Sequence, residues 1–554
     1  MTARQDRSSS ASDPRRDVTH SARRWWALIA IAASVLVVGL DLTVLNLALP
    51  TMSVSLHAST SDLQWITDSY SLVLAALILP AGLLGDRYGR KRMLLIALVV
   101  FGAASLACAY MSSVGGLIAA RAVLGIGAAA IFPLALSVLP VLFDGADRQR
   151  AVAAIGGATM LSFPIGPMVG GFLLDHFWWG SVFLINVPVV VIAVLAVAFL
   201  LPESKSAVRP SIDLAGLAVS SLGLVALTYG LIKAGQDGWS DATALVLVAA
   251  GVVVLGVLPM VERRVADRGG QPLADLRLFR SADFRWGTIL ATLMSFVMFG
   301  MLFALPQYFQ DVRGANALGS GIRLLPMIGG MLVGMLGGTR LMSPRRAKGG
   351  RAADVGQAAA QPPVAGPRPV LTTGYLLMAA AMALGAFTTL ASSTGYTLAW
   401  VAVAGLGVGL VLPASMGVAL GALSAERSGA GSALLTAMRQ VGSTVGVAVL
   451  GTVISNSYAH GVAGAAAGLP AQAATAVRSS VGSGVAVAGK VGSSSLLDTV
   501  RTAFVHGMDQ MLWTCGGIAV ACALLAVIVL RRRTGATNAA GGVADSVPGS
   551  LPVA

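Results

Sequence analysis

Residues 25–50 read WWALIAIAASVLVVGLDLTVLNLALP, an apolar run that begins at two tryptophans and contains one ionisable side chain, Asp41. A helix needs about 20 consecutive apolar residues to cross the hydrocarbon core of a bilayer. The stretch therefore predicts a membrane-spanning helix with a carboxyl group inside it. Because a charge inside a span is costly, this carboxyl group is a candidate functional residue.

Similar apolar runs fill most of the chain. The 554 residues are 56% hydrophobic and 11% charged, with a mean hydropathy of +0.80, whereas soluble proteins are about a quarter charged. This composition excludes a soluble enzyme and predicts an all-α integral membrane protein, because helices satisfy their own backbone hydrogen bonds in lipid. The fourteen predicted spans are 25–49, 63–84, 93–112, 116–142, 150–174, 182–201, 214–233, 242–261, 285–308, 321–341, 370–390, 396–422, 433–457 and 508–530.

The basic residues predict the orientation of these spans. Of the 38 lysines and arginines, 30 lie in the two terminal segments and in alternate connections between spans. Cytoplasmic loops carry an excess of Lys and Arg, so we expect a multi-pass protein of the bacterial cytoplasmic (plasma) membrane with both termini cytoplasmic. Topology then explains the net charge of +14, and no nucleic-acid partner is expected.

The connections divide the spans into a 6+2+6 arrangement. We expect a disordered cytoplasmic tail at 1–24, a six-helix bundle at 25–203, two linking helices at 204–283, a second six-helix bundle at 284–530 and a disordered cytoplasmic tail at 531–554. Two long connections in the second bundle are predicted to be flexible loops. These are 342–369 on the inside and 458–507 on the outside, where a short amphipathic or re-entrant helix is an alternative.

A short repeat suggests that the two bundles are related by duplication. Gly125-x-Gly127 followed by Pro133 in the fourth span has the same spacing as Gly405-x-Gly407 followed by Pro413 in the twelfth span. Internal repeats of this kind occur in many transporters. In this register, Arg121 of the first bundle corresponds to Val401 of the second.

Three charged residues share the outer half of the first bundle. Asp41 and Asp68 are the acids that lie clearly inside spans, and Arg121 lies at a similar depth in the fourth span. Asp41 and Arg121 form either a structural ion pair or a site at which Asp41 binds and releases a proton. Asp68 lies nearer the outer end of its span. It is interpreted either as a substrate contact or as a solvated residue at the start of the helix.

The sequence offers no metal site or catalytic cluster. Cys108, Cys515 and Cys522 all lie inside predicted spans without metal-binding or disulfide spacing, so we interpret them as packing residues. No cofactor or metal is expected, and a proton gradient is the expected driving force.

Four ordered motifs resemble those of the fourteen-helix drug:proton antiporters of the major facilitator superfamily, and the resemblance covers about residues 25–530. The motifs are Leu40-Asp41-Leu42-Thr43-Val44-Leu45-Asn46-Leu47-Ala48-Leu49-Pro50 in span 1, Gly82-x-x-Gly85-Asp86-Arg87-x-Gly89-Arg90-Lys91-Arg92 in the loop between spans 2 and 3, Arg121 with Gly125-Ile126-Gly127 in span 4, and Gly166-Pro167-x-x-Gly170-Gly171 in span 5. In addition, Asn186-Val187-Pro188 opens span 6 as in those proteins.

The resemblance implies roles for three groups of residues. Asp41 and Arg121 would couple transport to protons. The loop residues Gly85, Asp86, Arg87, Gly89 and Arg90 would hold the cytoplasmic side closed, and Gly166, Pro167, Gly170 and Gly171 would let span 5 bend and seal the bundle. The family pattern often has a glycine where this sequence has Ser162.

The run from Trp65 to Leu72 is most similar to multidrug exporters for quaternary ammonium and other lipophilic cations. It makes Asp68 and Tyr70 candidates for substrate binding, together with Arg439 and Gln440 in span 13. Those exporters carry further acids in spans 10 and 13, where this sequence has Met331 and Gln440.

These observations predict a proton-coupled antiporter that exports lipophilic drugs, biocides or antibiotics, expected to be cationic, by alternating access. The alternative is a dedicated self-resistance exporter of one antibiotic or secondary metabolite. A membrane-embedded enzyme or sensor would need a catalytic cluster or a soluble domain, so no enzyme is expected. We expect the partners to be protons, small lipophilic substrates and the lipid bilayer, and the chain to act as a monomer.

Overall fold

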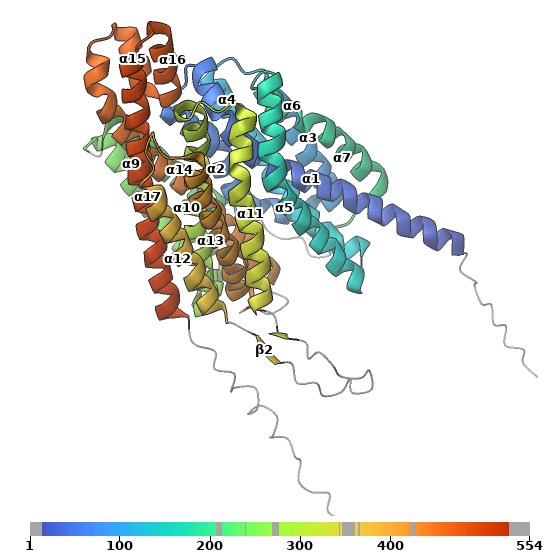
Figure 1. The fold of residues 1–554 in the computed structure, drawn as a ribbon. Coiled ribbons are helices and arrows are strands. Elements are labelled where there is room, and N and C mark those ends of the chain that lie inside the picture. Colours follow the sequence, from blue (N-terminus) through green and yellow to red (C-terminus); the bar gives the residue numbers. More distant parts are fainter. Residues whose placement is uncertain are drawn as a thin grey trace, which may run out of the picture.

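A computed structural model of the chain shows an elongated set of helices (Figure 1). It describes residues 14–143, 145–205, 213–238, 240–268, 276–342, 344–345, 361–363, 366–421, 423 and 428–530. The predicted tail at 531–554 and most of the predicted loop at 342–369 lie outside these residues.

Seven helices form the N-terminal group. Their apolar side chains pack into one buried cluster that includes Phe101, Leu124 and Phe183. The helices are α1 Pro14–Ser55, α2 Thr60–Tyr88, α3 Arg90–Ala109, α4 Val114–Leu142, α5 Gly145–His176, α6 Ser181–Leu184 and α7 Asn186–Leu200. The sequence prediction of a disordered tail at 1–24 is wrong for residues 14–24, because α1 already begins at Pro14.

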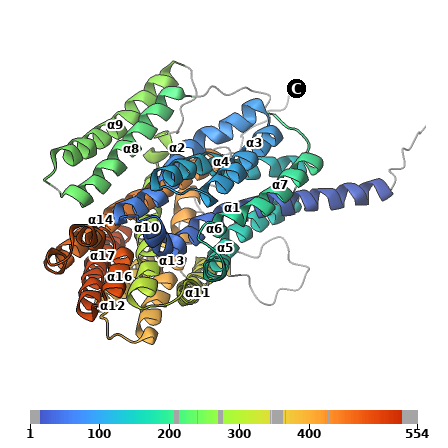
Figure 2. The ribbon, with the colours of Figure 1, turned by 90° about the horizontal axis from the view of Figure 1, so that it is seen from above.

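Two further helices, α8 Leu214–Asp237 and α9 Ala242–Asp267, pack against each other beside the main body. Figure 2 shows them on one flank of the molecule, next to α2 and α14, whereas α5 and α11 lie on the opposite flank. The carboxylates of Asp213 and Asp241 cap the first turns of α8 and α9 by accepting bonds from Gly216 N and Ala244 N. Acceptors at this position satisfy backbone N–H groups that a helix leaves unpaired.

The remaining helices form the C-terminal group around a second buried cluster, which includes Met294, Tyr375 and Trp400. They are the 3-10 helix η1 Leu276–Arg280, α10 Ala282–Gln307, the π-helical turn η2 Tyr308–Val312, α11 Ala317–Met342, α12 Pro367–Gly385, α13 Thr394–Gly421, α14 Ser428–Ala467, α15 Ala471–Ser479, α16 Val481–Val491 and α17 Ser494–Val529. Two short antiparallel strands, β1 Pro344–Arg345 and β2 Gln361–Pro363, lie between α11 and α12.

The segment 458–507, predicted as a flexible outer loop, is helical. Helix α14 continues to Ala467, α15 and α16 follow, and α17 already begins at Ser494. The amphipathic helix that was left open as an alternative is therefore the better description. We call α15 and α16 the cap, the end of the molecule that carries them the cap end, and the opposite end, where α1 begins and α17 ends, the terminal end (Figure 1).

Eleven candidate spans among the described residues are long and apolar enough to cross a membrane. Helices α2, α5 and α12 are not among these candidates, but they pack directly against α4, α1 and α13. The fold is thus an assembly of apolar helices, many of which could cross a membrane, as the composition predicted.

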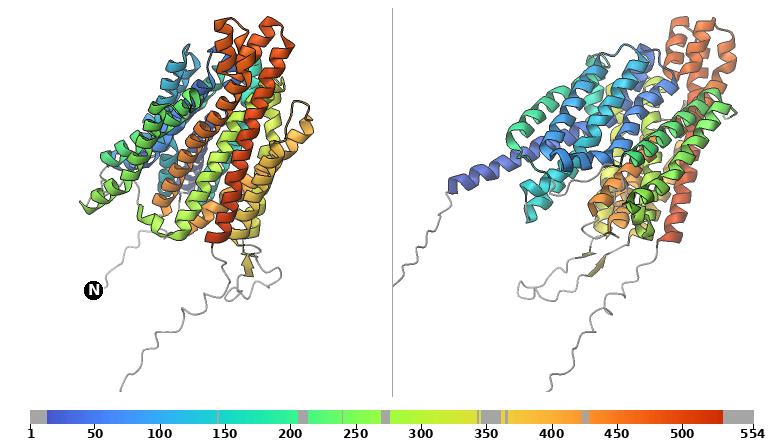
Figure 3. Two further views of the ribbon diagram at one scale, coloured as in Figure 1. Left: turned by 90° about the vertical axis from the view of Figure 1, so that its left-hand side faces the viewer. Right: turned by 180° about the vertical axis from the view of Figure 1, so that it is seen from behind.

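The two groups touch each other at the cap end. The polar contacts between them there include Asp175 Oδ1 with Ala317 N at 3.0 Å, Gln64 Nε2 with Ala448 O at 3.0 Å, Gln310 Nε2 with Leu47 O at 2.9 Å, and Ser53 Oγ with Ser480 Oγ at 2.7 Å. Toward the terminal end the ribbons of the two groups diverge (Figure 3). The described conformation is therefore closed at the cap end.

Candidate proton and substrate site

A buried ion pair lies inside the N-terminal group. Asp41 of α1 and Arg121 of α4 are 3% and 1% exposed, and Arg121 Nη1 lies 2.5 Å from Asp41 Oδ2. Removing two charges from water costs several kcal/mol for each ion, and good geometry is needed to offset that cost. The burial of this ion pair therefore indicates that Asp41 and Arg121 have a role other than filling space in the core.

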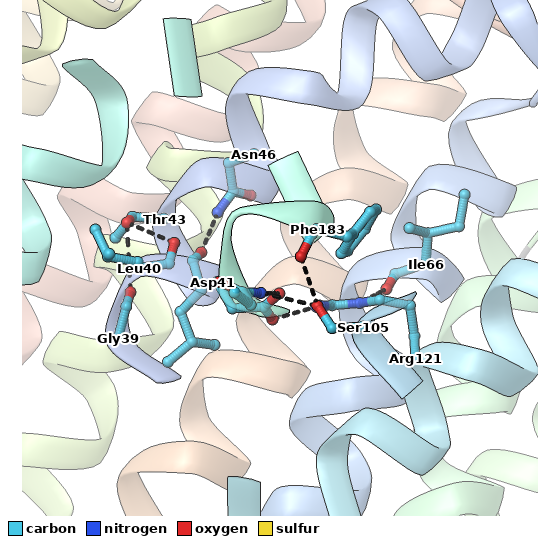
Figure 4. A network of polar contacts seen from close by, with 11 residues as sticks. Gly39, Leu40, Asp41, Thr43, Asn46, Ile66, Ser105, Arg121 and Phe183 are labelled. Atoms are coloured by element: carbon cyan, nitrogen blue, oxygen red, sulfur yellow. Dashed lines mark hydrogen bonds and ion pairs between the residues drawn. The ribbon is translucent and has the colours of Figure 1, made fainter. Parts of the chain in front are cut away.

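Asp41 has a second donor from another helix. Asn186, the first residue of α7, is 1% exposed, and its Nδ2 lies 3.4 Å from Asp41 Oδ1 and 3.0 Å from Ser105 Oγ. Ser105 of α3 in turn donates to Phe183 O at 2.9 Å. Figure 4 shows Asp41, Ser105 and Arg121 meeting between these helices. Both carboxylate oxygens thus accept bonds from neighbouring helices.

Arg121 is held on its other sides by α2. Its Nε donates to Ile66 O at 3.2 Å, and its guanidinium carbon lies 4.5 Å from the centre of the Tyr70 ring. A cation over an aromatic face gains about 0.5–2 kcal/mol. The structure therefore places Tyr70, predicted as a substrate contact, against the ion pair, with its fully buried hydroxyl lacking a partner among the described residues.

Asp68 does not join this cluster. On a helix with 3.6 residues per turn, Asp68 lies nearly opposite to both Ile66 and Tyr70, and one turn from Gln64, which bonds to α14. Its side chain is fully buried, and neither carboxylate oxygen has a partner among the described residues. The alternative of a solvated helix entry does not describe this conformation, in which Asp68 lies on the side of α2 that faces α14.

The two candidates on α14 differ in their surroundings. Arg439 donates from Nε to Ser295 Oγ of α10 at 3.3 Å, so its side chain is directed into the C-terminal group. Gln440 has a buried Nε2 without a partner in the described part of the chain. Gln440 is one turn from Thr444, whose buried hydroxyl is also unpaired there. Unpaired polar atoms at this depth can bind a substrate.

The loop between α2 and α3 packs within the N-terminal group. Gly89 has φ of +114°, which favours glycine, and a Cβ there would lie 2.6 Å from Glu203 Oε1. The Glu203 carboxylate accepts bonds from the backbone N–H groups of Lys91 and Arg92 at 3.2 Å. Gly85 is buried against the side chain of Leu134.

The charged members of this loop are only partly described. Arg87 and Arg90 both make polar interactions, and Arg90 N donates to Ser204 O at 2.9 Å. The side chain of Asp86 lies outside the described side chains. The ribbons of the two groups diverge toward the terminal end (Figure 3), so the expectation that this loop holds that side closed is not tested by this conformation.

The span-5 motif serves two interfaces at once. Gly166 and Gly170 pack against Thr43 and Val44 of α1. On another face of α5, a Cβ on Gly171 would lie 2.6 Å from Leu318 Cα, and the Pro167 carbonyl packs against Gly321, both on α11. The motif thus joins α5 to its own group and to the C-terminal group near the cap end.

Sequence reasoning missed Ser105, which contacts Asn186, and Glu203, which contacts the loop between α2 and α3. Asn186 was noted only as the start of a span. Asn186 had a detectable signal, since an amide at the start of an apolar helix is unusual, but its contact with Asp41 depends on how α7 packs against α1. Among the described residues, no group of three or more His, Cys, Asp or Glu could hold a metal ion.

The fold and the buried charges define a membrane transporter. Residues 31–360 match the family model described as Major Facilitator Superfamily, and this chain belongs to that superfamily. It is 32% identical over 517 residues, 91% of both chains, to the tetracenomycin C resistance and export protein of Streptomyces glaucescens. It is also 32% identical over 515 residues to the multidrug efflux pump LfrA of Mycolicibacterium smegmatis, covering 92% of this chain and 97% of that one.

A solved structure shares the fold. A bacterial homolog of the human lysosomal transporter Spinster, described as inward-facing and unoccupied, superposes with a TM-score of 0.62 at 15% sequence identity. The match covers 94% of this chain and 98% of that one. This match shows the shared fold, and the family model and the two relatives confirm the family resemblance inferred from the four motifs.

Proposed function

We propose that this protein is a proton-coupled antiporter that exports lipophilic drugs, biocides or antibiotics, mainly cationic ones, by alternating access. The relatives that support this are resistance and efflux proteins. Transport without catalysis is the function that the superfamily match and the exporter relatives support. The proton gradient is the driving force, and the protein needs no cofactor.

The observation that carries the proposal is the Asp41–Arg121 pair with Asn186 beside it. Asp41 is the group that gains and loses the proton, because it is a buried acid whose two side-chain donors come from two other helices, α4 and α7. A rearrangement of α1, α4 and α7 changes the number of donors around the carboxylate. Opposite charges and hydrogen bonds favour the ionised form of a carboxyl group, so such a change drives proton release or uptake.

The test is substrate-induced proton release from energised everted vesicles. The Asp41→Asn variant should insert and fold but release no protons, because an amide cannot carry one. The matched control is Asp237→Asn, which makes the same chemical change on the exposed end of α8. Normal release by Asp41→Asn at equal protein level would show that the pair is only structural.

We also propose a topology of fourteen spans in a 6+2+6 order, with both termini cytoplasmic and the chain acting as a monomer in the bacterial cytoplasmic membrane. In this orientation the terminal end faces the cytoplasm and the cap faces outward. The measurement is labelling of single cysteines in intact cells after replacement of Cys108, Cys515 and Cys522, all buried. Labelling at 350 from outside, or protection at 472 in the cap, would overturn this topology.

A second candidate is a dedicated self-resistance exporter of one antibiotic. The relative that exports tetracenomycin C supports it. A panel of dyes and antibiotics in a host without its own exporters separates the two functions. Resistance to chemically unrelated cations supports the multidrug exporter, whereas resistance confined to one compound class supports the dedicated one.

A further inference from the structure

Helix α8 contacts one helix from each group, α2 and α14, and these two helices also contact each other. Leu224 of α8 is buried in an apolar cluster with Leu72 of α2, and Val441 of α14 packs against it. Nearer the cap end, Ile232 of α8 is buried in a second cluster, against which Trp65 of α2 packs. The three helices therefore meet along one line, which we call the three-helix junction.

Asp68 of α2 is directed into this junction. Gln64, Asp68 and Leu72 are spaced by four residues, so they follow one face of the helix. Gln64 donates to Ala448 O of α14 at 3.0 Å, and Leu72 packs against α8. Asp68 lies between them and is fully buried, and neither of its carboxylate oxygens has a partner among the described residues.

Thr228 of α8 lies at the same level of the junction. It follows Leu224 by four residues and precedes Ile232 by four, so it lies on the same face, between the two apolar clusters. On α2, Asp68 lies between the same two clusters. Thr228 is fully buried, and its hydroxyl has no partner in the described part of the chain.

Thr444 of α14 brings a second hydroxyl to this level. It lies between Val441 and Ala448, which belong to the lower and the upper apolar cluster, and it is 1% exposed. A threonine in a helix can donate to the carbonyl four residues earlier, as Thr436 of α14 does to Ser432 O at 2.8 Å. The Thr444 hydroxyl makes no such bond and is unpaired among the described residues.

These three side chains offer a defined set of ligand atoms. Two carboxylate oxygens and two hydroxyl oxygens come from three helices, and buried polar atoms without partners are costly. Oxygen ligands suit hard cations rather than zinc or copper. One carboxylate balances one positive charge, since a second charge would be buried without a partner. The apolar clusters on both sides restrict the site to a single small ion.

We propose that Asp68, Thr228 and Thr444 form a binding site for one small monovalent metal cation of the size of Na⁺. The linking helix α8 supplies one of its ligands. Because the ligands come from both groups and from α8, the bound cation holds these helices together in the conformation that is closed at the cap end. The site is separate from the Asp41–Arg121 pair, and it goes beyond the proposed proton coupling.

The test is binding of radioactive sodium ion to the purified full-length protein in detergent, measured by scintillation proximity. Choline chloride keeps the ionic strength constant. Thr228→Val and Thr444→Val each keep the side-chain shape and remove one oxygen, and Asp68→Asn removes the charge. The matched control is Thr67→Val, which makes the same change on α2, where the Thr67 hydroxyl donates to Leu63 O at 3.0 Å.

We expect the parent protein and Thr67→Val to bind one sodium ion per chain in a saturable manner. Asp68→Asn should lose this binding, and Thr228→Val and Thr444→Val should each raise the Kd about tenfold, the effect of losing one modest ligand contact. Absence of saturable binding by the parent protein would overturn the proposal. Unchanged affinity in Thr228→Val would show that α8 supplies no ligand. An equal loss in Thr67→Val would mean that binding depends on general packing and not on these oxygens.

A second measurement keeps the test decisive if a variant is unstable. A ligand that binds only the folded protein raises its unfolding temperature. Sodium chloride, compared with choline chloride, should raise the unfolding temperature of the parent protein and of Thr67→Val, but not that of Asp68→Asn. A rise in Asp68→Asn equal to that of the parent protein would overturn the site. Neither readout uses drug transport or proton release, so failure of the export function would leave this inference standing.

Discussion

Helices α4 and α13 occupy equivalent places in the two groups, yet only one of them carries a charge. Gly125 of α4 packs on the Tyr70 carbonyl of α2, and Gly405 of α13 packs on the Met327 carbonyl of α11. At the equivalent position one turn earlier, α4 has Arg121 and α13 has the fully buried Val401. The comparison teaches that backbone packing is shared by the two groups, whereas at this position a charge is present only in the first group.

The largest effect is expected from filling the shared glycine contacts. A Cβ on Gly127 would lie 2.8 Å from Ala97 O, and a Cβ on Gly407 would lie 2.6 Å from Gly374 O. We expect Gly127→Val and Gly407→Val to abolish recovery of folded protein in size-exclusion chromatography, because backbone atoms cannot move aside cheaply. The control Gly417→Val, also in α13, meets no atom within 4 Å. If valine were tolerated at only one of the two positions, the backbone packing of the two groups would not be equivalent.

The next effect concerns the charge that the groups do not share. Arg121→Met leaves the buried Asp41 unpaired, which should cost about 3–5 kcal/mol. The equivalent apolar exchange, Val401→Met, should cost less than about 3 kcal/mol, as mild overpacking does. Thermal unfolding in detergent gives the comparison. Equal destabilisation by the two variants would show that Arg121 acts by its volume and not by its charge.

A smaller effect is expected on substrate choice. Asp68→Asn should weaken export of monovalent cationic dyes more than export of neutral drugs, and Arg439→Gln should act in the opposite sense. One charge at an effective dielectric of about 20 and about 5 Å is worth roughly 3 kcal/mol before screening. Resistance profiles against matched charged and neutral compounds provide the measurement. Equal loss for both compound types, at equal protein level, would exclude selection by charge.

The smallest effect is expected at Asn186. Asn186→Ala removes one donor from Asp41 while Arg121 remains, and a hydrogen bond to a charged group contributes about 1.5–3 kcal/mol. Proton release should persist with an altered pH profile, unlike in Asp41→Asn. The control Asn316→Ala removes an amide from the surface contact with Asp175 near the cap end. An unchanged pH profile for Asn186→Ala would show that Asn186 does not affect proton release by Asp41.

Much of the fold could be predicted because it depends on local sequence. A run of about 20 apolar residues is sufficient to indicate a span, and every predicted span overlaps a helix over most of its length, with 182–201 divided between α6 and α7. The cap could not be predicted in this way. Its Gly-, Ala- and Ser-rich helices are too short to cross a membrane, and they dock through distant contacts such as Ser480 with Ser53.

The candidate site, like the fold, could be predicted only where local sequence was sufficient. Equal depth in their spans was enough to suggest that Asp41 and Arg121 meet. The separation of Asp68 from them could not be predicted, because it depends on Ile66 and Tyr70 being the residues of α2 that face Arg121. Sequence could not show that Arg439 turns toward Ser295, since that contact depends on the packing of α14 against α10. The roles of these residues in coupling and substrate choice stay predictions.

The hairpin of α8 and α9 has a consequence for how such a chain could have evolved. Its two antiparallel crossings return the chain to the end from which it left, so an insertion of this kind does not invert the helices that follow. Because α9 presents most of its apolar surface outward and packs mainly on α8, the hairpin is a separate structural unit at the junction of the two groups. An insertion of one helix or three would have turned the second half upside down relative to the first.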